Sequence, residues 1–209
     1  LAKSFWRNKL PKVSIVIPVK NCSESIEKSI DSVIKQTFKD FEIIVVDNIS
    51  SDSTIEKIES FNDKRIKIIK CETPGIVPAL NTGLYNSNSP IIARQDGDDI
   101  WYPTKLEKQI KVLDDKKEVD ICGTQIRLVS IAGDVIDDKF RYPINDVAIK
   151  SWLLTGKNAI AHPSVIFRRN ILLRVGGYDD TYPISEDHHM WLRCIKWFNF
   201  QNLGEVLVD

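Results

Sequence analysis

The sequence lacks several features that would assign it to a class at once. It has no apolar run of the roughly 20 residues that a membrane-spanning helix requires, and no recognisable signal peptide. Its 29 basic and 29 acidic side chains cancel, which argues against a nucleic-acid-binding surface or a highly charged tail. The four cysteines are far apart and form no CxxC pair, so we expect lone buried thiols in a reducing compartment.

Glycine is missing where two nucleotide-binding classes need it. The stretch "PVKNCSES", residues 18–25, follows the first apolar run and contains no glycine. A dinucleotide-binding fold of the dehydrogenase kind requires a GxGxxG loop at this point and is therefore not expected. A sugar-nucleotide nucleotidyltransferase usually carries a glycine-rich loop with a basic residue here, so that class is only an alternative.

What is present is a regular alternation of apolar strands and amphipathic helices. The runs at 13–19, 41–47, 65–70 and 90–96 are rich in β-branched residues, as expected of strands buried on both faces. Amphipathic stretches with helical spacing separate them. This order predicts an α/β fold with a mostly parallel central sheet, right-handed crossovers and flanking helices.

Local signals predict where the helices begin. We expect Asn21 to cap the first helix, and Asp52 or Ser53 to cap the second. Pro78 and Pro103 are expected to open the next two helices, because proline is tolerated in a first turn.

The pattern changes after Glu118. Strands joined by a turn at 132–134, a helix over 146–154, a strand over 162–169 and a helix after Glu186 are predicted there. No linker rich in Gly, Ser or Pro divides the chain, and no repeat is visible. We therefore expect a single domain.

Three aspartates follow the fourth predicted strand. Ligands bind beyond the carboxyl ends of the strands in a parallel sheet, so residues 18–21, 47–52 and 94–99 are candidates for one shared site. Gly97 adds no side chain between Asp96 and Asp98, which lets both carboxylates turn toward one point.

A divalent cation would relieve the repulsion between these carboxylates. Mg²⁺ and Mn²⁺ prefer oxygen ligands and complete their shells with water and substrate phosphates. The alternative is an Asp-Gly-Asp turn whose charges are simply solvated.

Six segments of the chain resemble, in order, those of the family 2 glycosyltransferases, which are inverting enzymes with the GT-A fold. They lie between residues 12 and 200 and read "VSIVIPVKN", "FEIIVVDNISSDST", "PALNTGL", "IIARQDGDDIWYPTKLEKQ", "HPSVIFRR" and "GGYDDTYPISEDHHMWLRC". The resemblance implies an N-terminal extension over 1–11 and one glycosyltransferase domain over 12–209. Within it, 12–117 would bind the nucleotide-sugar and 118–209 would hold the acceptor and the catalytic base. We expect the chain to be truncated at its C-terminus, because "GEVLVD" ends within an apolar run.

The resemblance also implies roles for single positions. Asp47 would hydrogen-bond the uracil ring, and Arg94 would lie near the diphosphate. Asp98 would contact the metal directly, Asp96 would contact the ribose or the metal, and Asp99 is a reserve candidate. The implied nucleotide-sugar-binding residues are Pro18, Val19, Lys20, Asn21, Asp47, Asn81, Arg94, Asp96, Gly97 and Asp98.

On the acceptor side, the resemblance implies that Asp187 is the general base and that Glu186 supports the helix start or the acceptor site. Acidic residues are also favoured at a helix N-terminus for electrostatic reasons alone, which is the alternative. His162 and His188 are weaker candidates for acceptor contact. Adjacent histidines on a helix point in different directions, so we favour contact with acceptor or solvent over metal ligation for His188 and His189.

Inverting transfer is an in-line displacement that requires stabilisation of the leaving group and a general base for the acceptor. Negative charge builds on the leaving diphosphate, where a Mg²⁺ or Mn²⁺ cofactor and Arg94 would stabilise it. The acceptor hydroxyl must lose a proton, and an aspartate with a reference pKa of ~3.9 is ionised at neutral pH and can take it. Direct displacement requires no nucleophilic Ser or Cys.

The expected function is therefore metal-dependent transfer of a hexosyl or N-acetylhexosaminyl group from a nucleotide-sugar, first of all a UDP-sugar, to a hydroxyl of a glycan or lipid-linked acceptor. A non-catalytic nucleotide-binding module of the same fold is a second alternative. We expect the protein in the cytoplasm or at the inner face of the membrane, with any membrane association made through parts outside this chain. We expect no nucleic-acid partner. Lys20 replaces a frequent aromatic residue, and Asn48 and Ile49 replace a frequent Asp-Gly, so GDP and dTDP remain open beside UDP.

Overall fold

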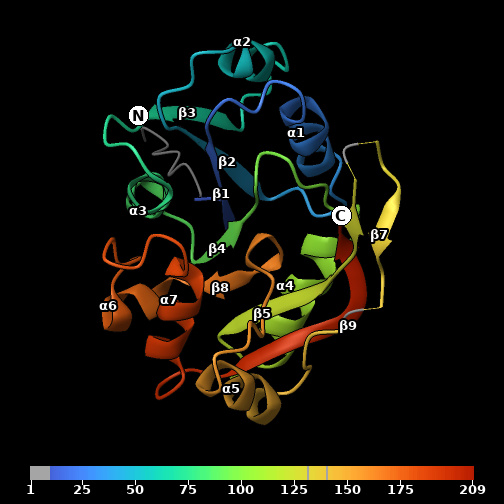
Figure 1. Cartoon of the computed structure of the whole chain (residues 1–209), viewed down its shortest axis with the longest axis vertical. Helices are drawn as coiled ribbons and strands as arrows, with labels where there is room; N and C mark the ends of the chain where they lie inside the picture. The colour runs from blue at the N-terminus through green and yellow to red at the C-terminus, as the bar shows by residue number, and fades with distance from the viewer. Residues whose placement is uncertain (1–9, 131, 140) are drawn as a thin grey trace, which may run out of the picture.

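The computed structural model describes residues 10–130, 132–139 and 141–209. Its central sheet has seven strands in the order β3-β2-β1-β4-β8-β5-β9 (Figure 1). Each strand runs parallel to its neighbours except β8, which is antiparallel to both β4 and β5. The strands are β1 (Val13–Val19), β2 (Phe41–Asp47), β3 (Ile66–Lys70), β4 (Ile91–Arg94), β5 (Ile121–Ile126), β8 (Ile166–Arg168) and β9 (Phe200–Val208). The prediction of an α/β fold with a mostly parallel sheet is confirmed.

The central strands are buried on both faces, as their apolar runs predict. Every residue of β1 and β2 is buried. In β1, Ile15 and Ile17 face one hydrophobic core, whereas Val16 faces the other. This explains why these strands read as continuous apolar runs rather than alternating ones.

Helices cover both faces of the sheet (Figure 1). α1 (Ile26–Ile34) and α4 (Lys105–Asp115) pack on the face that includes Ile15, and α2 (Thr54–Glu59) lies against α1. The opposite face is covered by α3 (Ile76–Asn86), α5 (Asp146–Leu154) and α7 (Glu186–Cys194), with α6 (Leu172–Val175) beside α7. Gly83 lets α3 approach β1 closely, because a Cβ there would lie 2.3 Å from Cγ1 of Val16.

One predicted helix start is wrong, and a second was placed two residues too late. α1 begins at Ile26 behind Ser25, whereas Asn21 lies in a left-handed conformation (φ 52°) and accepts a hydrogen bond from the backbone N–H of Ser51 (2.8 Å). The Asn21 side chain is thus used to join two loops rather than to cap a helix. α3 begins at Ile76, two residues before Pro78.

The other two starts lie close to the predicted positions. α4 begins at Lys105, just after Pro103, and α2 begins at Thr54. Asp52 accepts a hydrogen bond from the backbone N–H of Thr54 (3.1 Å), whereas Ser53 makes no side-chain capping bond.

The second half of the chain adds three strands to the central sheet and a small separate sheet. β6 (Leu128–Val129) and β7 (Val135–Asp137) pair antiparallel, and Gly133 between them has φ 93°. The strand predicted over 162–169 is shorter, because a 3₁₀ turn η1 (His162–Ser164) precedes β8 and a second, η2 (Arg169–Ile171), follows it. No described helix has the length and hydropathy needed to cross a bilayer. The four cysteines are free thiols.

Candidate active site

Three parallel strands end at one edge of the sheet and bring their loops together. Val19 at the end of β1 pairs with Asp47 at the end of β2, and Val16 of β1 pairs with Arg94 at the end of β4. The loops after β1 and β2 are joined by the Asn21–Ser51 bond. The predicted grouping of residues 18–21, 47–52 and 94–99 is therefore what the topology produces.

The turn after β4 forms a cluster of carboxylates. Oxygens of Asp96, Asp98 and Asp99 all lie within 4.8 Å of one another, and no other such acidic, His or Cys group occurs in the described part of the chain. Burial raises the pKa of Asp99 to about 7, and the charges of Asp96 and Asp98 add to this effect. The cluster is short of positive charge and offers only oxygen ligands, so these residues fit a divalent cation such as Mg²⁺ or Mn²⁺.

Arg94 neutralises one of these carboxylates. Its side chain is only 5% exposed, and both Nη1 and Nη2 donate to the Asp96 carboxylate. Arg94 Nε is buried without a partner among the described residues. With Asp96 held in this bidentate pair, Asp98 and Asp99 keep more of their oxygens open, which favours Asp98 for direct metal contact. The role of Arg94 at a diphosphate remains a prediction.

Ser25, just before α1, and Ser29 within α1 hold the backbone of this acidic turn. Ser25 Oγ donates to the Gly97 carbonyl (3.0 Å) and Ser29 Oγ to the Asp96 carbonyl (2.9 Å). Buried Gln95 donates to Ser29 Oγ (2.8 Å) and to the Asp99 carbonyl (2.9 Å). The sequence analysis missed these residues; the signal available to it was serine at helical spacing on the buried face of α1.

The loop after β2 is closed by Asn48, one of the departures from the family pattern. Its amide donates to the carbonyls of Cys71 (3.2 Å) and Thr73 (2.7 Å) and accepts from the Gly75 N–H (2.8 Å). Ile49 follows in a left-handed conformation (φ 64°), which is strained for a β-branched side chain and natural for the glycine it replaces. Asn48 therefore fastens this loop to the start of α3.

Asp47 is buried, and its carboxylate accepts a hydrogen bond from the backbone N–H of Ser50 (3.0 Å). Pro18 and Val19 are buried in β1 beside it, whereas Lys20 is exposed. These positions lie where the sequence analysis expected a nucleoside pocket, and their contacts with a nucleotide remain predictions.

A cleft of about 730 Å³ opens in front of the acidic turn. It is bounded by residues from both halves of the chain, among them Lys20, Asn21, Cys22, Asp52, Asp98, Asp99, Arg127, Leu128, Val129, Gly133 and Pro163. Strand β6, Gly133 of the turn that follows it, and Asp209 contribute to this wall, and the sequence analysis gave none of them a role.

The start of α7 faces the end of β4. Glu186 is the first residue of the helix, and burial raises its pKa, with Arg94 and Asp96 among the charges that act on it. Asp187 follows, half-buried, and accepts a hydrogen bond from the backbone N–H of His188 (2.6 Å). Arg94 and Asp96 therefore lie close enough to Glu186 for their charges to act on it, although neither Glu186 nor Asp187 lines the cleft described above; a shared site for the two acidic motifs remains a prediction.

The sequence model of glycosyl transferase family 2 matches residues 14–176, more than half of the chain. The chain belongs to this family. It is 32% identical over 209 residues to the O-antigen biosynthesis glycosyltransferase WbnJ of Escherichia coli, covering 96% of this chain and 79% of WbnJ. It is also 32% identical over 185 residues to the E. coli protein named UDP-Glc:alpha-D-GlcNAc-diphosphoundecaprenol beta-1,3-glucosyltransferase WfgD, covering 88% of this chain and 70% of WfgD.

Solved structures show that this glycosyltransferase has the GT-A fold. Staphylococcus aureus TarS 1–349 in complex with UDP-GlcNAc has a TM-score of 0.77 at 21% identity, covering 94% of this chain and 57% of that one. The mannosyltransferase PcManGT of Pyrobaculum calidifontis, solved with GDP-Man and Mn²⁺, has a TM-score of 0.68 at 19% identity, covering 95% and 56%. At these identities the likeness shows the fold alone, and the chain spans less than two thirds of either structure.

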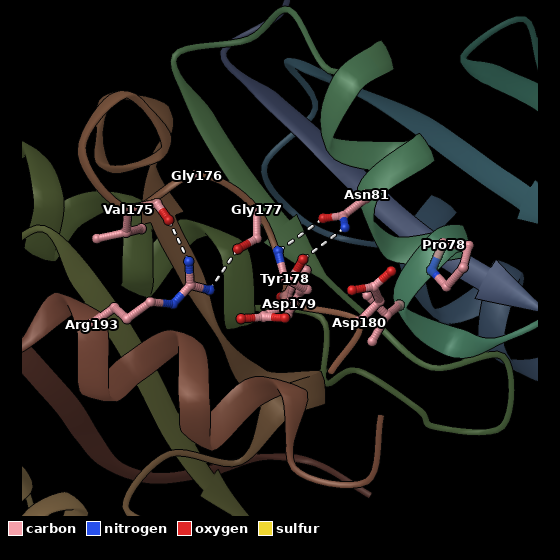
Figure 2. A pocket seen from close by; sticks show the side chains of 10 residues that line it. Pro78, Asn81, Val175, Gly176, Gly177, Tyr178, Asp179, Asp180 and Arg193 are labelled. Atoms are coloured by element: carbon pink, nitrogen blue, oxygen red, sulfur yellow. Dashed lines mark hydrogen bonds between the residues drawn. The ribbon is translucent and has the colours of Figure 1, made fainter. Parts of the chain in front are cut away.

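Asn81 does not join the cleft in front of the acidic turn. It lines a separate cavity of about 440 Å³ between α3 and the loop before α7 (Figure 2). Asn81 Nδ2 donates to the carbonyl of Tyr178 (2.8 Å), and Asn81 Oδ1 accepts from the N–H of Tyr178 (2.8 Å). A Cβ on Gly177 would lie 2.3 Å from Asn81 Oδ1, and Arg193 donates to the Gly177 carbonyl (2.6 Å). The Asn81 amide is therefore committed to holding this loop, although the sequence analysis placed it beside the nucleotide.

We expect Asn81→Ala to lower the free energy of unfolding by about 1–3 kcal/mol, because it leaves both backbone polar groups of Tyr178 without their partner. Chemical denaturation measures this loss, and Asn88→Ala, which changes an exposed amide in the same region, should have little effect. UDP affinity in Mn²⁺ should stay unchanged in Asn81→Ala. Lost UDP affinity with unchanged stability would instead support nucleotide contact by Asn81.

Proposed function

We propose that this family 2 glycosyltransferase transfers a sugar from a UDP-sugar, with inversion and with a divalent metal, to a hydroxyl of a glycan or lipid-linked acceptor. The observation that carries the proposal is the proximity of two acidic motifs far apart in the sequence. Arg94 and Asp96 at the end of β4 lie close enough to Glu186 to affect its pKa, and Asp187 is the next residue. Such an arrangement suits a donor pyrophosphate on one side of the sugar and an acceptor on the other.

Asp98 and Asp96, with Asp99 beside them, are the residues we assign to holding Mn²⁺ or Mg²⁺. A cation bound there supplies positive charge to the leaving diphosphate. Arg94 adds a buried positive charge fixed in place by its pair with Asp96.

The residues at the ends of β1 and β2 bind the nucleoside in this proposal. Asp47 hydrogen-bonds the base, while Pro18, Val19, Lys20 and Asn21 line its pocket. We assign residues 12–117 to the donor and residues 118–209 to the acceptor and the base. Asp187 accepts the proton of the attacking hydroxyl, and Glu186 supports it. No covalent intermediate is required, so the free thiols have no catalytic part.

The names of relatives support the choice of substrates. WfgD is named for a UDP-glucose donor and a diphosphoundecaprenol-linked acceptor, and TarS has been solved with UDP-GlcNAc. We therefore propose a hexosyl or N-acetylhexosaminyl donor and a lipid-linked or glycan acceptor. Four unpaired thiols suit a reducing compartment, so we place the reaction in the cytoplasm or at the inner face of its membrane.

Thermal unfolding with and without ligands tests the proposal. UDP at 100 times its Kd, together with Mn²⁺, should add about 2.7 kcal/mol and raise the unfolding midpoint by roughly 5–10 °C. Mn²⁺ alone and UDP with a chelator should give much smaller shifts. The same measurement with GDP and with dTDP shows which nucleobase the protein prefers. No shift with any nucleotide in Mn²⁺ or Mg²⁺ would contradict the proposal.

A further inference from the structure

His162 is a buried histidine near the end of β4, and the proposed mechanism gives it no role. It opens the turn η1 directly before β8, which runs antiparallel to β4. The backbone N–H of Arg94 donates to the Val165 carbonyl (3.1 Å), so this turn lies beside the end of β4. His162 therefore lies near the end of β4, yet only 8% of the residue is exposed.

Two aromatic side chains fix the orientation of the His162 ring. Tyr178, 5% exposed, places its Oη 2.9 Å from His162 Nε2. The ring centroid of Tyr178 lies 5.4 Å away, and Trp191 meets the imidazole edge-on at 6.5 Å and 82°. Asn81 fixes Tyr178 in turn through both backbone polar groups. With Nε2 facing Tyr178, the other nitrogen, Nδ1, faces Glu186 Oε1 at 3.7 Å.

The surrounding charges decide which ring nitrogen carries the proton. Burial and the positive charge of Arg94 hold the pKa of His162 well below its usual value, so the ring is neutral and has one N–H. Burial raises the pKa of the Tyr178 hydroxyl, which stays protonated and able to donate. If Nε2 carried the proton, the lone pair of Nδ1 would face the Glu186 carboxylate. If Tyr178 donates to Nε2, the N–H lies on Nδ1 and points at that carboxylate, which satisfies all three groups.

We propose that Tyr178 and His162 form a positioning relay, in which Tyr178 donates to Nε2 and the Nδ1–H of His162 holds the Glu186 carboxylate. The 3.7 Å between Nδ1 and Oε1 is longer than a direct hydrogen bond, and the proposal requires a side-chain rotation of Glu186 to shorten it. One oxygen of Glu186 is then bound to the imidazole, and the other is free for a sugar hydroxyl beside Asp187. The proposed contact of Glu186 with a sugar hydroxyl rests on the proposed function, whereas the order of the hydrogen bonds among Tyr178, His162 and Glu186 does not.

In this proposal His162 positions Glu186 and does not contact the acceptor itself. The sequence analysis offered it as a direct acceptor contact, but a ring enclosed by Tyr178 and Trp191 acts through Glu186 instead. His162 is thus a positioning residue, and an error in the placement of Glu186 would be felt in turnover rather than in nucleotide binding.

Nitrogen NMR of histidine-labelled full chain tests the hydrogen-bond order without any activity. We expect the His162 ring to be neutral at neutral pH, with the proton on Nδ1 and an unprotonated Nε2. Glu186→Gln should move the Nδ1–H proton upfield, because a neutral amide is a weaker acceptor than a carboxylate. A proton on Nε2, a doubly protonated ring, or an Nδ1–H unaffected by Glu186→Gln would overturn the proposal.

Two substitutions at His162 test the function of the relay. Asparagine can place an amide N–H where Nδ1 stands, whereas glutamine places it nearer the position of Nε2. We expect His162→Asn to keep most of the slow hydrolysis of UDP-GlcNAc or UDP-Glc in Mn²⁺, and His162→Gln to lose roughly 10- to 100-fold in kcat. UDP binding should be unchanged in both variants and serves as the folding control. Equal losses in the two variants would overturn the relay, whereas absent UDP binding in the unaltered protein would contradict only the proposed function.

Discussion

Replacing Asp98 by asparagine is expected to abolish the Mn²⁺-dependent part of UDP binding. Asp98 is the exposed member of the carboxylate cluster, and Asp96 is already paired with Arg94. Asparagine keeps the size of the side chain but loses the charge that a hard cation requires. We expect the affinity for UDP at fixed Mn²⁺ to fall by at least about 100-fold, measured by calorimetric titration.

The same substitution should stabilise the metal-free protein, which separates loss of function from misfolding. Asp99 ionises near pH ~3.9 when unfolded, but in the folded chain burial and then the charges of Asp96 and Asp98 raise its pKa to about 7. Between these values the folded state holds more protons than the unfolded state, so this group makes stability fall as pH rises. Removing the charge of Asp98 lessens that fall. The unfolding midpoint of Asp98→Asn should therefore exceed that of the unaltered chain at neutral pH, and by less in acid.

Asp115→Asn is the matched control for this experiment. Asp115 lies at the end of α4 and pairs with Lys111 on the surface, where solvent screens the two charges and the pair adds little to stability. Its substitution should change neither UDP binding nor the pH dependence of stability. Retained Mn²⁺-dependent binding in Asp98→Asn would contradict the assignment of Asp98 as a metal ligand, whereas a lower metal-free midpoint would contradict the predicted repulsion between Asp98 and Asp99.

The central strands could be predicted from the sequence because each is marked by a local run of apolar, β-branched residues. β1 and β2 were predicted with the bounds that the structure has, since each is a continuous β-branched run buried on both faces. The acidic turn was also predictable, because it follows a strand whose end must lie at the ligand-binding edge. The pairing of Arg94 with Asp96 follows the same logic, since alternate residues of an extended chain point the same way.

The side-chain partners that the sequence analysis did not find depend on contacts between distant segments. Asn21 carries a strong capping signal, but the neighbouring loop uses its side chain, and Ser25 begins the helix instead. Asn81 reads as a polar residue beside the nucleotide, yet its partner is the backbone of Tyr178, 97 positions away. The contact between His162 and Tyr178 depends on the same loop before α7, because Asn81 holds the Tyr178 backbone in place. No local pattern encodes such pairs, because each is fixed only after the two halves pack.

Replacing Asp187 by asparagine is expected to lower turnover by about 10²- to 10⁴-fold and to leave UDP binding unchanged. Asparagine keeps the shape of the side chain and can still accept from the His188 N–H, but it cannot take a proton from an attacking hydroxyl. The helix start should survive, since Glu186 still provides an acidic residue in the first turn. Release of UDP from UDP-GlcNAc and from UDP-Glc, with water as the acceptor, measures the effect before a natural acceptor is known.

Glu186→Gln is the comparison that assigns the base to one of two adjacent carboxylates. In the proposed mechanism Glu186 orients a hydroxyl and Asp187 takes the proton, so the loss in kcat should be smaller for Glu186→Gln than for Asp187→Asn. Asp187 is the more open of the two and can reach an acceptor hydroxyl, whereas Glu186 is enclosed near His162 and burial raises its pKa. If Glu186→Gln caused the larger loss while Asp187→Asn turned over near normally, the proton would be going to Glu186, and the imidazole of His162 would then be positioning the base itself.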